Sequence, residues 1–282
     1  MTEEKWDLEI APQRSLLDIP WKDIWRYRDL LMLFVRRDFV SQFKQTILGP
    51  TWFFIQPILT TVVFMVVFTG IAEIPTDGVP PTLFYLSGLV GWNYFADCLN
   101  KTSNTFIGNA NIFGKVYFPR IVVPISIVLS NLMRFGVQFM LFLAVWLYYL
   151  VTTDQIFITI YILLVPIAII NIGLIGLGLG MIVSSLTTKY RDLTFLIAFG
   201  VQLLMYATPV IYPLSQAGEG TILLLIKANP LTPLIESFRQ GFMGQGVVDW
   251  NLWIYSIVFM LITLALGTVI FNKVEKDFMD TV

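Results

Sequence analysis

Residues 189–218 read KYRDLTFLIAFGVQLLMYATPVIYPLSQAG, and this stretch decides the fold of the chain. It opens with three charged residues in four, and the next 26 residues, 193–218, carry no charge. A helix of roughly 20 apolar residues crosses a bilayer core, so residues 193–211 are long enough to cross one. Pro209 and Pro213 prevent a regular helix beyond that point, because proline lacks a backbone N–H donor. The stretch therefore predicts a membrane span that ends near residue 211.

The segment between this span and Trp250 contains only two short pieces of helical character. Residues 222–226 are too few to cross a membrane, and residues 234–242 form an amphipathic piece after Pro230 and Pro233. Two short pieces between two spans predict re-entrant helices that enter the membrane and return to the same side. Such backbone is tolerated at membrane depth only where it is buried in protein or lines a water-filled cavity.

The composition identifies an integral membrane protein and excludes several kinds of site. Hydrophobic residues make up 56% of the 282 residues, charged residues only 13%, and the mean hydropathy is +0.75. The sequence has no histidine, and its one cysteine, Cys98, can form neither an intrachain disulfide nor a cysteine zinc site. Residues 108–116 come nearest to a phosphate-binding loop, but five residues instead of four separate the two glycines. We therefore expect that this chain is not an enzyme and that it binds no cofactor or metal. The net charge of −1 gives no basic face that would bind nucleic acid.

Apolar runs along the chain predict an all-α integral membrane protein with six transmembrane helices. The runs cover residues 51–72, about 83–97, 121–151, 157–186, 193–211 and 252–272. They form one transmembrane domain, residues 51–272, between a cytoplasmic N-terminal region of residues 1–50 and a cytoplasmic tail of residues 273–282. In the fourth run, Gly176 and Gly180 are spaced to let another helix approach closely.

The N-terminal region contains a predicted amphipathic helix, residues 21–44. Trp21 and Trp25 lie on its apolar arc, and most of its charged residues lie opposite. Arg28 interrupts the apolar arc, and we expect its guanidinium to reach water by snorkelling. These features predict a helix in the cytoplasmic membrane interface. The alternative is an ordinary helix of a soluble N-terminal subdomain.

The distribution of lysine and arginine predicts the orientation. Fifteen of the 18 lie in segments that share one side of a six-span arrangement, and only Lys227 and Arg239 lie on the other side. Because positive charge is enriched in cytoplasmic loops, both termini are expected in the cytoplasm and residues 214–249 outside. Arg134 lies inside the third run, and we expect it to snorkel to the cytoplasmic interface. Asp97 and Lys101 have the spacing of a helix ion pair. The predicted spans contain no series of acidic side chains that could relay protons, which argues against a proton-coupled pump.

Aromatic residues make up 15% of the sequence, more than interfacial belts alone require. Aromatic rings also pack on the C–H faces of sugars, so some of these residues are candidates for lining a path for a glycan. The candidates are Phe53, Phe64 and Phe68 on the first span and Phe199 and Tyr206 on the fifth. Contact with lipid is the alternative for each of them.

Five short motifs, taken together and in order, resemble one family of membrane proteins. They are Leu48-Gly49-Pro50 with Trp52 and Gln56-Pro57, the connector at residues 115–120, Tyr190-Arg191-Asp192, the segment 208–213, and Asn229-Pro230-Leu231 with Pro233. The family is the permease subunits of ABC exporters for bacterial surface polysaccharides, namely O-antigen, capsule and teichoic acid. The resemblance covers roughly residues 30–275.

The resemblance implies a homodimer of six-span subunits in the bacterial cytoplasmic (inner) membrane. Each subunit would dock on a separate cytoplasmic ATPase subunit, which binds ATP and Mg²⁺, and the first and fifth spans would line a channel. The resemblance also assigns an outer gate at about residues 214–249, with candidates Leu223, Ile226, Pro230 and Pro233. Coupling to the ATPase would use the predicted helix 21–44 and the connector residues Asn111, Phe113, Lys115 and Tyr117.

The substrate implied by the resemblance is a lipid-linked surface polysaccharide of the O-antigen type. Export of teichoic acid or capsular polysaccharide is the nearest alternative, because the same motifs would serve it. A drug-exporting ABC permease is an alternative of another class, which a large extracellular domain or a fused ATPase would favour. A secondary transporter or channel would require inverted repeats or intramembrane ion ligands, and the sequence shows neither.

Overall fold

A computed structural model describes residues 21–116, 118–218 and 220–281, and within these ranges the regular structure is entirely helical. The eleven α-helices are separated by turns and by four shorter 3₁₀ or π segments. The α-helices are α1 (Trp21–Arg26), α2 (Arg28–Ser41), α3 (Trp52–Phe64), α4 (Pro81–Ser103), α5 (Thr105–Phe113), α6 (Val122–Thr152), α7 (Val165–Thr187), α8 (Leu193–Tyr206), α9 (Thr221–Ala228), α10 (Thr232–Met243) and α11 (Trp250–Thr281). The shorter segments are η1 (Gly49–Thr51), η2 (Met65–Ile71), η3 (Ile160–Leu164) and η4 (Leu214–Gln216).

Four helical stretches among the described residues are long and apolar enough to cross a membrane. They are Gly49–Ile71, Val122–Thr152, Ile160–Thr187 and Trp250–Lys276. These stretches confirm the prediction of an all-helical membrane protein. Helix α8 is apolar but shorter, and it ends at Tyr206, earlier than predicted, because the following residues turn at Pro209.

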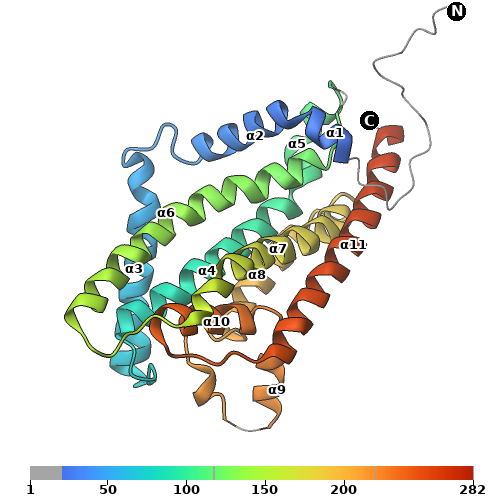
Figure 1. Ribbon diagram of the computed structural model, residues 1–282. Coiled ribbons are helices and arrows are strands. Elements are labelled where there is room, and N and C mark those ends of the chain that lie inside the picture. Colours follow the sequence, from blue (N-terminus) through green and yellow to red (C-terminus); the bar gives the residue numbers. More distant parts are fainter. Residues whose placement is uncertain (1–20, 117, 219, 282) are drawn as a thin grey trace, which may run out of the picture.

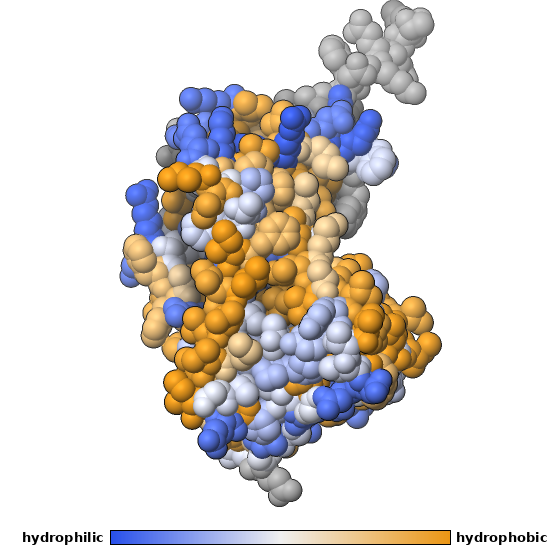
Figure 2. Space-filling view, turned by 90° about the vertical axis from the view of Figure 1, so that its left-hand side faces the viewer, coloured by the Kyte–Doolittle hydropathy of each residue, from blue (hydrophilic) through white to orange (hydrophobic). Residues whose placement is uncertain are grey.

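The helices place different segments at two ends of the molecule (Figure 1). Helices α1, α2 and α5 and the C-terminal part of α11 gather at one end, which we call the α2 end. Helices α9 and α10 lie at the other end, which we call the α10 end. On the face in Figure 2, a broad hydrophobic region lies between hydrophilic residues at the two ends. This distribution agrees with a protein whose middle zone lies in a bilayer.

The predicted helix 21–44 is two helices, because the chain turns at Tyr27 between α1 and α2. Helix α2 does not present its whole apolar arc to a membrane. Leu31, Phe34 and Val35 are buried against other parts of the chain, where α2 packs on α6. Leu31 and Val35 of the predicted apolar arc therefore pack inside the protein, and the position of the helix in the membrane interface stays a prediction. Residues 1–20 and the side chain of Trp21 lie outside the described part.

Helix α7 is the central helix, and glycines allow it to pack closely on α4 and α11. A Cβ atom at Gly176 would lie 2.7 Å from Cys98 Cβ on α4, and one at Gly180 would lie 2.5 Å from Thr102 Cβ. On another face of α7, a Cβ atom at Gly178 would lie 2.7 Å from the backbone carbon of Thr263 on α11. Real Cβ atoms do not approach so closely, so these helix contacts depend on glycine.

Replacing Gly178 by alanine should therefore destabilise the protein. The added methyl group would meet backbone atoms of α11, which cannot rotate away, and overpacking of this kind costs about 1–3 kcal/mol. Gly136→Ala on α6 is the matched control, because a Cβ atom there would have no neighbour within 4 Å. Thermal unfolding in detergent should give a lower Tm for Gly178→Ala and an unchanged or higher Tm for Gly136→Ala. Equal Tm values for the two variants would contradict this account of the α7–α11 contact.

Candidate transport site

Helix α10 is inserted into the protein instead of lying on its surface. Every residue from Thr232 to Arg239 is buried, and the helix packs against η3, α7 and α4. A cluster of aromatic rings fixes its position relative to α6. The rings of this cluster, with centroids 5.1–6.0 Å apart between neighbours, are those of Phe139, Phe142, Trp146, Phe238 and Phe242.

A buried ion pair anchors α10 to three other segments. Arg239 Nη1 lies 3.2 Å from Glu236 Oε1, and each side chain is only 3% exposed. Arg239 Nη2 donates to the carbonyl oxygen of Val210 at 3.0 Å, and the guanidinium carbon lies 3.7 Å from the centroid of the Phe84 ring. Glu236 Oε2 accepts a hydrogen bond from the backbone N–H of Val247 at 3.2 Å. The two charges therefore join α10 to the turn after α8, to α4 and to the segment before α11.

The sequence analysis placed Arg239 on the outer side and did not predict its pairing with Glu236. Burial raises the pKa of the Glu236 carboxyl, and the neighbouring Arg239 guanidinium opposes that effect. Removing one partner of a buried ion pair leaves an uncompensated charge and typically costs about 3–5 kcal/mol. The ion pair therefore stabilises the position of α10 in the fold.

Two glycines, one on each side, leave space for the ion pair of Glu236 and Arg239. A Cβ atom at Gly88 on α4 would lie 3.0 Å from Arg239 Nη2 and 3.1 Å from the Cα atom of Val210. Gly246 has a φ of +135°, and a Cβ atom there would lie 2.6 Å from the carbonyl oxygen of Glu236. Larger residues would therefore displace the arginine on one side or the loop before α11 on the other.

Asn229 joins two of the sequence motifs in space. Its Nδ2 atom donates to Thr208 Oγ1 at 2.7 Å and to the carbonyl oxygen of Ala207 at 3.2 Å. Its Oδ1 atom accepts the backbone N–H of Leu231 at 3.0 Å, so the same side chain also forms the turn into α10. Pro233 follows in the first turn of α10, a position where proline is tolerated. The motif at 208–213 and the motif at 229–233 are thus one structural unit.

Helix α9 is held much more loosely than α10. Ile226 is its one buried residue among those described, Leu223 is half-buried, and Leu224 is 68% exposed. Among the predicted gate residues, Pro233 and Ile226 are therefore buried, while Leu223 and Pro230 lie partly at the surface. Leu224 and Leu225 are the exposed leucines of α9, and both belong to the apolar run 222–226 that the sequence analysis singled out.

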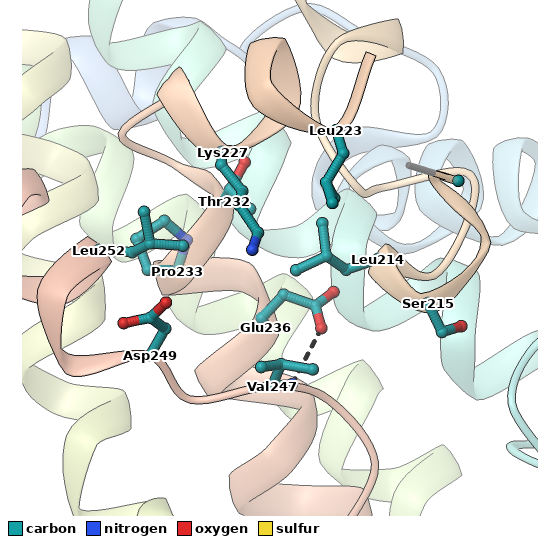
Figure 3. A pocket seen from close by; sticks show the side chains of 11 residues that line it. Leu214, Ser215, Leu223, Lys227, Thr232, Pro233, Glu236, Val247, Asp249 and Leu252 are labelled. Atoms are coloured by element: carbon teal, nitrogen blue, oxygen red, sulfur yellow. Dashed lines mark hydrogen bonds between the residues drawn. The ribbon is translucent and has the colours of Figure 1, made fainter. Parts of the chain in front are cut away.

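A cavity of about 330 Å³ lies between α9, α10 and the start of α11. Its wall combines aliphatic side chains with the charged groups of Lys227, Glu236 and Asp249 (Figure 3). The aliphatic residues of the wall are Leu214, Leu223, Pro233, Val247 and Leu252. Figure 3 also shows the hydrogen bond from Val247 to Glu236 at the edge of this cavity.

The predicted coupling residues lie at the α2 end, but they do not share one environment. Asn111 and Lys115 are exposed, whereas Phe113 is buried, with its ring centroid 5.9 Å from that of Phe118. The guanidinium carbon of Arg120 lies 5.2 Å from the Phe113 ring. Coupling to the ATPase stays a prediction for these residues, and the Phe113 ring packs inside the chain. Tyr117 lies outside the described residues.

The side chains of the predicted interface helix also differ from one another. Trp25 is 72% exposed, and the Arg28 guanidinium carbon lies 5.6 Å from its ring centroid. Arg28 Nη1 donates to the carbonyl oxygen of Trp25 at 3.4 Å. Farther along, Arg37 Nη2 donates to Asn109 Oδ1 on α5 at 3.4 Å. Helix α2 and the connector after α4 are therefore in direct contact.

The five aromatic candidates for a glycan path lie in three settings. Phe53 is buried beneath α2, with its ring centroid 5.6 Å from that of Phe39. Phe64 and Phe68 are half-buried and contact the Tyr85 ring on α4, with centroids 6.1 and 6.3 Å away. Phe199 and Tyr206 are exposed on α8. Lining of a channel stays a prediction for these residues, and Phe53 faces its own chain in this structure.

Charged residues of α4 and α6 meet beneath α2. Arg134 Nη1 lies 2.7 Å from Asp97 Oδ2, and Arg134 Nη2 donates to Gln56 Oε1 on α3 at 3.1 Å. Lys101 Nζ donates to Asn131 Oδ1 at 2.8 Å. The predicted pair of Asp97 with Lys101 was therefore wrong, since the carboxylate pairs with Arg134. The sequence signal for this contact was the presence of two opposite charges, Asp97 and Arg134, inside apolar runs.

Comparisons with known proteins identify the family. The family model described as "ABC-2 type transporter" matches residues 29–243. The chain is 29% identical over 252 residues to the O-antigen export system permease protein RfbA of Klebsiella pneumoniae, covering 89% of this chain and 94% of that protein. It is 25% identical over 262 residues to the protein of the same name in Myxococcus xanthus, covering 93% and 98%. It is 21% identical over 248 residues to the polysialic acid transport protein KpsM of Escherichia coli, covering 85% and 91%.

The family match spans well over half of the chain, from α2 to the end of α10. It includes the ion-paired helix α10, the Asn229 turn, the connector after α4 and the charged residues of α4 and α6. This chain therefore belongs to the ABC-2 type transporter family.

Proposed function

We propose that this chain is the membrane permease subunit of an ABC transporter that exports a lipid-linked surface polysaccharide of the O-antigen type. The observation that carries the proposal is the likeness to O-antigen export permeases over 89–93% of this chain. The identity to those permeases, 25–29%, exceeds the 21% identity to the polysialic acid transport protein. That difference favours an O-antigen-type substrate over a capsular one, which is the second candidate.

The proposed permease has six spans, formed by the four candidate spans together with α4 and α8. Helix α4 has 23 residues and is therefore roughly 34 Å long at 1.5 Å per residue. Its hydropathy is lowered by polar residues such as Asp97 and Lys101, which are paired within the protein. Helix α8 with its following turn would form the fifth span. In this arrangement α9 and α10 are re-entrant, and the charge distribution supports a cytoplasmic location for both termini.

The working transporter is proposed to be a homodimer with two cytoplasmic ATPase subunits in the inner membrane. ATP and Mg²⁺ bind to those partner subunits, so this chain itself is not an enzyme. The exposed apolar side chains of α3 and α8 support a dimer in which these helices meet the second copy or line the path. Helices α1 and α2 and the exposed connector residues Asn111 and Lys115 are the parts proposed to meet the ATPase at the α2 end.

Deleting the gene for this chain from its bacterium tests the proposed function. The mutant should lose polysaccharide at the cell surface and accumulate lipid-linked polysaccharide inside the cytoplasmic membrane, because synthesis continues without export. Antibody or lectin labelling of intact and permeabilised cells measures both pools. Restoring the gene on a plasmid is the control, and a mutant with a normal surface pool would contradict the proposal.

Two substitutions in the connector should separate contact with the ATPase from packing within the chain. Lys115→Glu should lower export while the Tm and the amount of protein in the membrane stay unchanged, because Lys115 is exposed. Phe113→Ala should lower the Tm, because truncating a buried phenylalanine typically costs about 3–5 kcal/mol. Asp154→Lys, just after the end of α6 and away from the α2 end, is the control for reversing an exposed charge far from the ATPase. Normal export by Lys115→Glu would show that this side chain has no role in coupling.

A further inference from the structure

Three helices bring a group of charged and polar side chains together beneath α2. Arg134 of α6 is ion-paired with Asp97 of α4 and hydrogen-bonded to Gln56 of α3. Lys101, one turn after Asp97 on α4, donates instead to Asn131 of α6. We call these five residues the Arg134 cluster.

The Arg134 cluster has one more positive than negative charge. Arg134 and Lys101 contribute two cations, and Asp97 contributes the one carboxylate. On α2, Arg37 Nη2 lies 2.8 Å from Asp38 Oδ1, so this pair adds no net charge. A positive charge in a low-dielectric setting is costly without an anion.

The depth of the cluster matches the level of lipid headgroups. From Arg134 to the end of α6 at Thr152 the helix rises roughly 27 Å, at 1.5 Å per residue. From Asp97 back to the start of α4 at Pro81 it rises roughly 24 Å. Because a hydrocarbon core is about 30 Å thick, a bilayer aligned with the α10 end would place the cluster near the opposite interface, just beneath α2.

The cluster also reaches the surface, and some of its N–H donors make no hydrogen bond within the protein. The side chains of Arg134 and Asp97 are 16% and 27% exposed, and Gln56 beside them is exposed. The hydrogen bonds described above use three of the eight N–H donors that an arginine and a lysine carry together. Arg134 Nε is buried and has no hydrogen-bond partner among the described residues, so the available donors are the other N–H groups of Arg134 and Lys101. An anionic group arriving from the membrane would therefore meet unused donors and a matching charge.

We propose that the Arg134 cluster binds the phosphate group of a membrane lipid between α3 and α6, beneath α2. A guanidinium group and an ammonium group are the protein groups best suited to phosphate oxygens. Two sources carry this chemistry, an anionic phospholipid of the bilayer and the diphosphate of a polyprenyl carrier lipid. The site goes beyond the proposed function, and only its occupation by a carrier lipid rests on that function.

Native mass spectrometry of the purified full-length chain in detergent tests this site. Phosphatidylglycerol, a polyprenyl diphosphate and zwitterionic phosphatidylcholine are titrated separately. Both anionic lipids should bind more tightly than phosphatidylcholine. Arg134→Gln and Lys101→Gln should each weaken the binding of both by about five-fold, the factor expected for one cationic contact near an anionic headgroup. Whichever anionic lipid binds more tightly identifies the source of the phosphate.

The direction in which a third substitution changes the affinity for anionic lipids distinguishes phosphate binding from a purely structural role. Asp97→Asn removes the carboxylate that competes for Arg134, so it should strengthen the binding of anionic lipids. Arg134→Lys should keep most of the binding, and Lys227→Gln at the α10 end should leave it unchanged. Equal binding of all three lipids to the wild type would overturn the proposal. So would an anionic preference that persists in both glutamine variants, or weaker binding in Asp97→Asn.

Discussion

The buried ion pair of Glu236 and Arg239 is the constraint on which the α10 end depends. A guanidinium group that is almost completely removed from water must be neutralised and hydrogen-bonded, or it destabilises the fold. Here the carboxylate, the Val210 carbonyl group and the Phe84 ring together satisfy it. Because these groups belong to different segments, the turn after α8, the middle of α10 and helix α4 cannot shift independently. The loop before α11 is included through the N–H group of Val247.

This constraint divides the α9–α10 region into a fixed part and a looser part. Helix α10 is packed by the aromatic cluster and locked by its charges, so it behaves as part of the core. Helix α9 is attached through Ile226 and the Asn229 turn and leaves most of its leucines exposed. If the region opens and closes during transport, α9 is the part with the fewest contacts to break.

At the other end, α2, α5 and the end of α11 form a second packed group. The tightly packed helices α4 and α7 connect the two ends.

The sequence was a good guide to the helices because apolar run length and proline position are local properties. The run 121–151 predicted α6 to within one residue at each end, and the short pieces after Pro213 correspond to α9 and α10. The exposed faces of these helices could not be predicted, because rotation about a helix axis depends on what packs against it. Phe53 and Phe113 were therefore expected to face a channel and a partner, yet both are buried. The ion pair of Arg134 with Asp97 was not predicted, because the two residues lie 37 positions apart in the sequence, where no periodicity links them.

Hydrogen–deuterium exchange of the purified protein in detergent tests most directly whether α10 is locked and α9 is loose. The backbone amides of residues 232–243 should exchange only slowly, because their opening requires the buried charges to separate. The amides of residues 221–228 should exchange much faster. In Glu236→Gln, which weakens the ion pair and keeps the side-chain size, α10 should lose much of its protection while α9 changes little. Equal exchange of α9 and α10 in the wild-type protein, or an α10 that stays protected in Glu236→Gln, would contradict this account.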